Sequence, residues 1–145
     1  MDNITLERIK TLHLKLRSEA EEIYKKICEE MPTGTICRFT HTLRTNAEQN
    51  ELYALGRTKP GKIVTNAKGG DSYHNYGLAI DFVLIVNGKA SWTINKDWLK
   101  VIEVFQSYGW ESGHYWKFKD SPHVQKTFGK TIKQLKEQKT QYPEL

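Results

Sequence analysis

The sequence has little cysteine and no long hydrophobic run. Cys28 and Cys37 are the only cysteines in 145 residues, which is too few for a disulfide scaffold, and they lack paired zinc-ligand spacing. We expect two buried or half-buried thiols. No apolar segment approaches the roughly 18 residues that a membrane-spanning helix needs, so we predict no membrane insertion. The start, Met1-Asp2-Asn3-Ile4, has neither the basic nor the apolar region of a signal peptide, so we expect synthesis in the cytoplasm without one.

Composition and charge fit one globular domain but do not identify a partner. Apolar residues make up 38% and charged residues 27%, which excludes collagen, coiled coil and wholesale disorder. The net charge of +5 is uneven, because residues 1–31 carry 6 basic and 7 acidic side chains while residues 32–95 carry 7 and 4. Such a mild positive excess suits nucleic acid, an acidic polymer or a cell wall alike.

The first segment has the periodicity of an amphipathic helix. Apolar side chains recur every three or four residues at Ile9, Leu12, Leu16, Ala20, Ile23 and Ile27, which predicts one helix over about residues 4–31. Pro32 and Gly34 end it. Its expected role is to pack against the rest of the domain.

The remainder alternates strands and helices. Alternation predicts strands at 36–43 and 77–86, and Asn87-Gly88 predicts a hairpin with a return strand at about 90–94. Thr45 and Glu48 form a capping-box pattern that opens a helix to about residue 55, and further helices are expected at 97–107 and 131–139, with residues 138–145 frayed. We therefore predict a small single α+β domain over residues 1–145, in which helices pack on an antiparallel sheet around the central hairpin.

Asp81 is the most informative residue because it lies inside the apolar run Leu78 to Ile85. A carboxylate in such a run is costly to bury unless it is paired or bound to a metal. A buried salt bridge, or a position on the solvated face of the strand, explains it equally well. A tight turn at Gly77 would bring His74 to the same point, and imidazole and carboxylate are both good zinc ligands.

A second polar cluster, Asp120-Ser121-Pro122-His123, could complete such a site. His123 offers a third ligand, and Asp120 offers a carboxylate that need not bind metal. Three protein ligands with one open position suit a catalytic zinc, and a free carboxylate nearby suits hydrolysis. A polar turn with an accidental histidine remains the alternative.

Three segments, in order, resemble the D-alanyl-D-alanine carboxypeptidase family, which includes vancomycin-resistance D,D-peptidases and phage endolysins that cut the L-alanyl-D-glutamate bond of peptidoglycan. The segment S-Y-H-N-Y-G-L-A-I-D, from Ser72 to Asp81, resembles the family's S-x-H-x-x-G-x-A-x-D zinc motif. Residues 120–123 resemble its D-x-x-H motif, and Arg44-Thr45 with Gln49 resembles its R-S/T-x-x-x-Q segment. The resemblance covers about residues 36–125 and implies a hedgehog/D,D-peptidase-like fold.

The resemblance also implies roles for individual residues. It implies one zinc ion per chain, held by His74, Asp81 and His123, with Asp120 as general base and Arg44 facing the substrate carbonyl. A structural ion pair with Glu48 is the alternative for Arg44.

Five further residues are candidates for substrate binding. They are Ser72, Tyr73, Gln49, Trp110 and His114. The aromatic members could equally be core residues, and Ser72 could be an ordinary loop hydroxyl. Endolysin-type relatives usually carry Trp-Gly-Gly-Asp where this chain has Trp110-Glu111-Ser112-Gly113-His114, which leaves the shape of the groove, the bond that is cut and the roles of His41 and His114 open.

The function predicted from the sequence is zinc-dependent hydrolysis of a peptidoglycan stem peptide, with an L-alanyl-D-glutamate endopeptidase preferred. The alternatives are a D,D-carboxypeptidase and a non-catalytic basic module that binds cell wall or nucleic acid. The presence of all three ligands and of Asp120 argues against an inactive module. We therefore expect a monomer that acts on the cell wall after release and does not bind nucleic acid.

Overall fold

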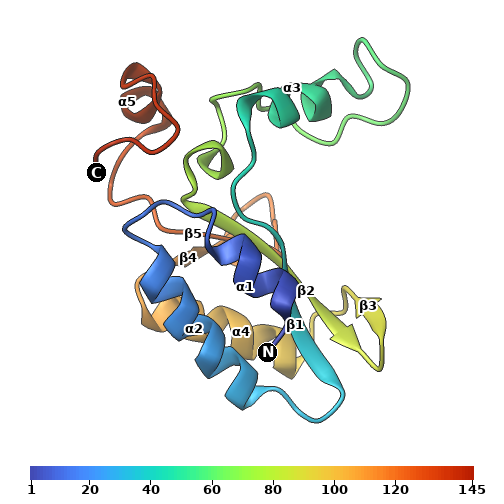
Figure 1. Ribbon diagram of the computed structural model, residues 1–145. Coiled ribbons are helices and arrows are strands. Elements are labelled where there is room, and N and C mark those ends of the chain that lie inside the picture. Colours follow the sequence, from blue (N-terminus) through green and yellow to red (C-terminus); the bar gives the residue numbers. More distant parts are fainter.

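The computed structural model describes residues 1–145 and contains one five-stranded antiparallel sheet (Figure 1). The strand order is β1-β2-β5-β4, and β3 pairs with β2 beyond this path. The strands are β1 (Thr35–His41), β2 (Ala79–Val86), β3 (Lys89–Ser91), β4 (Glu111–Ser112) and β5 (His123–Gln125). The predicted α+β class and antiparallel sheet are confirmed. The central hairpin is also confirmed: Asn87 and Gly88 connect β2 to β3 with φ of 50° and 82°, as a tight two-residue turn requires.

The N-terminal segment differs from its prediction. It forms two helices, α1 (Asn3–Ile9) and α2 (Arg17–Glu30), so the single helix predicted over residues 4–31 is wrong. The chain turns between them, and the backbone N–H of His13 donates to Gly77 O at 3.0 Å instead of continuing a helix. Leu12 and Leu16 are buried in this turn, so the apolar spacing continues across a region that is not helical.

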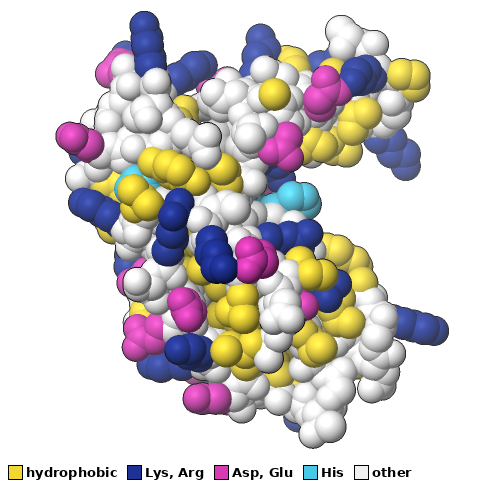
Figure 2. Space-filling model, viewed as in Figure 1, with side chains coloured by type: hydrophobic (Ala, Val, Ile, Leu, Met, Phe, Trp, Pro, Cys, Tyr) yellow, Lys and Arg dark blue, Asp and Glu magenta, His cyan; other side chains and the backbone are white.

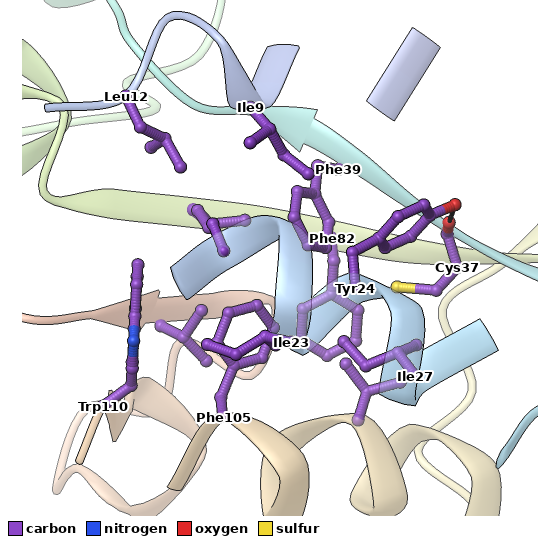
Figure 3. Close-up of a cluster of buried hydrophobic side chains, with 14 of the residues drawn as sticks. Ile9, Leu12, Ile23, Tyr24, Ile27, Cys37, Phe39, Phe82, Phe105 and Trp110 are labelled. Atoms are coloured by element: carbon purple, nitrogen blue, oxygen red, sulfur yellow. Dashed lines mark hydrogen bonds between the residues drawn. The ribbon is translucent and has the colours of Figure 1, made fainter. Parts of the chain in front are cut away.

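The main core lies between the sheet and the helices α2 and α4 (Lys96–Ser107). Figure 3 shows Tyr24 and Ile23 of α2 and Phe105 of α4 facing Phe39 and Phe82 of the sheet. All five side chains are fully buried, and each such burial stabilises the fold by about 1.5–3 kcal/mol. No helix is long and apolar enough to span a membrane.

The remaining helical segments are short, and Figure 1 shows α3 and α5 in the upper part of the molecule. They are α3 (Asn46–Ala54), the 3-10 turns η1 (Tyr73–Tyr76) and η2 (Gly113–Tyr115), and α5 (Ile132–Glu137). The predicted capping box is confirmed, because Glu48 N donates to Thr45 Oγ1 and Thr45 N donates to Glu48 Oε1. Both cysteines are free thiols, Cys37 buried and Cys28 half-buried, as expected.

The C-terminal segment is docked, so the prediction that residues 138–145 fray is wrong. The Tyr142 hydroxyl donates to Thr11 O at 2.7 Å. The His13 ring, in the turn between α1 and α2, lies 2.6 Å through Nε2 from Pro143 O. Because Lys15 N donates to the other nitrogen of this ring, Nε2 carries the proton and donates to the carbonyl.

Candidate metal centre

The sheet places three polar side chains in a row across neighbouring strands. His41 of β1 pairs with Asp81 of β2, and Asp81 pairs with His123 of β5. The register of β1 and β2 shifts between Phe39 and His41. Such an irregularity re-aims a side chain, and it brings His41 beside Asp81, away from the core that Phe39 occupies. The central strand thus carries a half-buried carboxylate with one imidazole on each side.

His74 reaches the row from the turn that precedes β2. It lies in η1, which Ser72 caps by accepting from His74 N, and Gly77 ends η1 with φ of 70°. A side chain at Gly77 would strike the backbone of Leu12 and His13, so glycine is required by both conformation and space. The sequence-based expectation that a turn at Gly77 brings His74 to Asp81 is confirmed.

His74, Asp81 and His123 converge on one point. Their candidate ligand atoms all lie within 4.8 Å of one another. Asp81 Oδ1 is 3.2 Å from His74 Nε2 and 3.1 Å from His123 Nδ1. The two histidines are buried and the Asp81 side chain is only 22% exposed. One carboxylate oxygen and two ring nitrogens therefore face each other in a largely dehydrated place.

The hydrogen bonds on the far side of each ring fit a metal site. His74 Nδ1 lies 2.9 Å from Thr42 O, and because a carbonyl only accepts, Nδ1 carries the proton and Nε2 of the neutral ring is a free lone pair. Nε2 is the one buried side-chain polar atom without a hydrogen-bond partner. In neutral His123, a proton on Nε2, 2.7 Å from Gln125 Oε1, likewise leaves Nδ1 free. Three acceptors then converge without a donor, and a divalent cation such as zinc would satisfy them.

Without a cation, the cluster perturbs its own acid–base behaviour. Burial raises the pKa of Asp81, but the close imidazoles of His123 and His74 outweigh it and hold the net pKa well below the usual range. Burial lowers the pKa of His123, but Asp81 reverses this and the net pKa is raised. Asp81 is therefore an anion, which is the form in which a carboxylate binds a metal ion.

Asp120 lies at the edge of this cluster, with Oδ2 3.9 Å from His123 Nδ1. Its side chain is 54% exposed, and partial desolvation raises its pKa above the ordinary value. Gly113 holds the Asp120 loop close, since Asp120 N donates to Gly113 O at 2.9 Å and a Cβ on Gly113 would clash with Asp120 O. Asp120 is thus a half-exposed base within reach of a molecule that contacts the cluster.

Arg44 faces the same cluster from the other side. Its Nη1 donates to Gln49 Oε1 at 3.0 Å, and its Nη2 lies 4.0 Å from Asp81 Oδ2. The alternative ion pair with Glu48 is not formed, because the Glu48 carboxylate caps α3 instead. Gln49 is fully buried and its amide also donates to Ala67 O. The prediction that Gln49 binds substrate is therefore wrong, and its place is behind Arg44, which it orients.

A cleft of about 380 Å³ opens above the cluster. Figure 2 shows a hollow between the part that carries α3 and the lower body, with a histidine at its base. The lining residues include all five of the predicted metal-binding and catalytic residues; the full set is His41, Arg44, Leu52, Val64, Thr65, Ser72, His74, Asp81, Asp120 and His123. Ser72 lines this cleft and its hydroxyl caps η1, so its contact with substrate stays a prediction.

Besides Gln49, three of the predicted substrate-binding residues do not line the cleft. Trp110 is a core residue, 3% exposed and packed on Phe105, so the prediction that it binds substrate is wrong. The Tyr73 hydroxyl donates to Lys130 O at 2.7 Å, away from the site. His114 Nδ1 lies 2.9 Å from Ser121 Oγ, so this ring contacts the loop that carries Asp120.

The sequence reasoning missed Gln125, the partner of His123, and Glu111, the partner of Gln125. Gln125 could have been found from the sequence, because side chains two residues apart in a strand lie on the same face and Gln125 is two residues after His123. Leu52 and Val64 were missed as lining residues because α3 and the following loop approach the cleft only through tertiary packing.

Comparison with known proteins finds a family model and a relative that are named for peptidases. Residues 65–126 match a family model described as D-alanyl-D-alanine carboxypeptidase, which confirms the resemblance seen in the sequence. The chain is 49% identical over 96 residues to peptidoglycan L-alanyl-D-glutamate endopeptidase CwlK of Bacillus subtilis (strain 168). That match covers 59% of this chain and 58% of CwlK, so the chain spans less than two thirds of the relative.

A solved structure shares the fold. The crystal structure of the Serratia marcescens L-Ala D-Glu endopeptidase ChiX matches with a TM-score of 0.60 and 23% sequence identity. The match covers 86% of this chain and 87% of that one. The α+β architecture is therefore common to both molecules over most of their length.

Proposed function

We propose that the chain is a zinc-dependent peptidase that cuts the L-alanyl-D-glutamate bond of peptidoglycan stem peptides, from the premise that residues 65–126 match the family model described as D-alanyl-D-alanine carboxypeptidase. The observation that carries the proposal is the convergence of His74, Asp81 and His123 beside Asp120 and Arg44 in one cleft. The names of CwlK and ChiX support the choice of bond.

The three converging residues are the proposed ligands of one zinc ion. When bound, zinc supplies Lewis-acid chemistry, lowering the pKa of a water molecule and polarising a carbonyl group. His74 and His123 would offer Nε2 and Nδ1, the nitrogens that their other hydrogen bonds leave free. Asp81 would add one negative charge, so the bound ion keeps a net positive charge that favours an anionic transition state.

Asp120 is the proposed general base. Its half-exposed carboxylate accepts a proton from the attacking water and returns it to the departing amine. The pKa of Asp120 is raised, which brings it closer to the pKa values of the water and the amine with which Asp120 exchanges the proton. Because Gly113 packs against the loop that carries Asp120 and accepts from Asp120 N, the backbone at Asp120 is in place before substrate arrives.

Arg44 is proposed to stabilise the oxygen of the scissile carbonyl as it becomes negative. The guanidinium has several donors in a fixed plane, and Gln49 occupies one edge at 3.0 Å. Nη2 lies 4.0 Å from Asp81 Oδ2, and Arg44 lines the same cleft as Asp81 and His74. Such a preorganised donor acts most strongly where charge develops.

Mass spectrometry of purified peptidoglycan digested by the zinc-loaded protein tests this proposal. We expect new fragments with a free D-glutamate amine, and at least about 100-fold slower release by Asp120→Asn, which keeps the size of the side chain but loses the base. Asp97→Asn, a carboxylate on α4 outside the cleft, is the matched control and should cut at the wild-type rate.

The same spectra separate the alternatives. Release of single D-alanine residues would identify a D,D-carboxypeptidase instead. Intact peptidoglycan of every stem chemistry after incubation with the zinc-loaded protein would overturn the proposed hydrolysis and favour a binding module.

A further inference from the structure

A chain of short hydrogen bonds leads from the surface to His123. The Gln125 amide donates through Nε2 to Glu111 Oε1 at 2.7 Å, and Gln125 Oε1 lies 2.7 Å from His123 Nε2. Gln125 is buried, whereas Glu111 is exposed on β4. The sheet itself sets this contact, because Glu111 and Gln125 are paired residues of β4 and β5 and Gln125 shares a face with His123.

The Glu111 carboxylate decides which atom donates and which accepts in each of these hydrogen bonds. An ionised carboxylate only accepts hydrogen bonds, so the amide must turn its NH₂ group toward Glu111 and its oxygen toward His123. An amide oxygen accepts, so His123 must present N–H from Nε2. The nitrogen that remains free of this bond is Nδ1, which is the one that faces Asp81. Without Glu111, the amide could rotate and present NH₂ to His123, which would favour the opposite tautomer.

Glu111 contacts His123 by a second route. The Trp116 indole donates to Glu111 Oε2 at 3.4 Å, and the Trp116 ring packs against the His123 ring with 5.3 Å between centroids. Both hydrogen bonds of this carboxylate therefore go to neutral N–H donors on residues that touch His123. A carboxylate placed only for solubility would not need either bond.

We propose that Glu111 is a positioning residue for the metal site. Acting through Gln125 and Trp116, it fixes the tautomer and orientation of His123, so that Nδ1 is available to a zinc ion. This inference rests on the proposed function, since it assumes that His123 is a zinc ligand. Partners of this kind raise ligand basicity, and their loss typically weakens metal binding 10- to 100-fold.

Zinc affinity of the isosteric variant Glu111→Gln provides the test. Metal-free protein would be titrated with zinc against a competing chelator, and we expect about 10-fold weaker binding than in the wild type. The matched control is Glu103→Gln, which removes one exposed carboxylate from α4, outside the cleft, and should bind zinc as the wild type does.

The double variant Glu111→Gln with Gln125→Glu exchanges the two side chains. It tests whether the order of donors and acceptors toward His123 matters, or only the presence of a side chain at each position. The new carboxylate at position 125 accepts directly from His123 Nε2–H, and the new amide at position 111 donates to that carboxylate. We expect the exchanged pair to bind zinc nearly as tightly as the wild type. Binding as weak as in Glu111→Gln would contradict a directional role.

Nuclear magnetic resonance of the ¹⁵N-labelled, zinc-loaded proteins observes the His123 Nε2–H proton directly. This signal would not change if Glu111 only stabilised the fold. In the wild type we expect a slowly exchanging, downfield Nε2–H proton on His123, and in Glu111→Gln faster exchange and an upfield shift. If Glu111→Gln changes neither the zinc affinity nor the exchange rate and chemical shift of the Nε2–H proton, this inference is overturned while the zinc site stands. A wild-type protein that binds no zinc would overturn the proposed function instead, and this inference with it.

Discussion

At the scale of single residues, the site depends on what lies behind each functional side chain. Thr42 O holds the far nitrogen of His74, and Gln49 holds one edge of the Arg44 guanidinium. These partners decide which atom faces the cleft. The residue types at positions 44, 74, 81, 120 and 123 could be predicted from motifs, but the partner of His74 could not, because a backbone carbonyl carries no sequence signal.

Replacement of Arg44 by lysine tests whether the planar guanidinium is needed. Lysine keeps the positive charge, but its single ammonium group cannot bond Gln49 and still present a fixed donor to the cleft. We expect kcat/KM for stem-peptide cleavage to fall about 100-fold or more, with zinc content unchanged, as measured by steady-state release of amino groups. Arg17→Lys, in α2 and outside the cleft, is the control; an Arg44→Lys enzyme as active as this control would refute the role.

At the scale of secondary-structure elements, α1 is fastened to β1 by a charged contact. Asp2 caps α1, and its carboxylate accepts from Arg38 through Nε at 3.1 Å and Nη2 at 3.0 Å. Burial raises the pKa of Asp2, but the hydrogen bonds and charge of Arg38 and those from Thr5 outweigh it, so the net pKa lies below the ordinary value. The pair therefore stabilises the fold at neutral pH.

The pH dependence of this contact can be measured with Asp2→Asn, which keeps a good helix cap but loses the charge. A lowered native pKa contributes stability that is present above the unfolded value, about 4, and is lost as pH falls through the native value. We expect the variant to be about 1 kcal/mol less stable at pH 7 and equal to the wild type well below pH 4, by urea unfolding. A difference that stays constant over this range would contradict the ion-pair account.

Element prediction succeeded where local signals agree and failed where tertiary contacts decide. The Asn87-Gly88 turn and the Thr45–Glu48 capping box were predictable because each is fixed by its own residues. The break between α1 and α2 could not be predicted, because there His13 N donates to Gly77 O, 64 residues further along the chain. The register shift that brings His41 beside Asp81 has no local signal either.

At the scale of the whole molecule, the two ends of the chain support the site together. Tyr142 and Pro143 bind the turn between α1 and α2. The same turn contacts Gly77, which ends the η1 turn carrying His74, and Thr11 Oγ1 lies 2.7 Å from Thr42 Oγ1. The C-terminal segment is therefore part of the framework behind the metal site.

Removal of one hydroxyl, Tyr142→Phe, measures this support. The variant loses the hydrogen bond to Thr11 O, and we expect a loss of about 1 kcal/mol, or about 2–4 °C in Tm for a chain of this size. Tyr115→Phe is the matched control, because the Tyr115 side chain is exposed. Equal melting temperatures for Tyr142→Phe and the control in calorimetry would show that the docked tail does not stabilise the domain.

The most direct measurement is a crystal structure of the zinc-soaked protein with anomalous data collected at the zinc edge. We expect a single strong peak per chain, about 2.0–2.2 Å from His74 Nε2, an Asp81 carboxylate oxygen and His123 Nδ1. A peak bound by other residues, or no peak at a zinc concentration that saturates known zinc peptidases, would contradict the account.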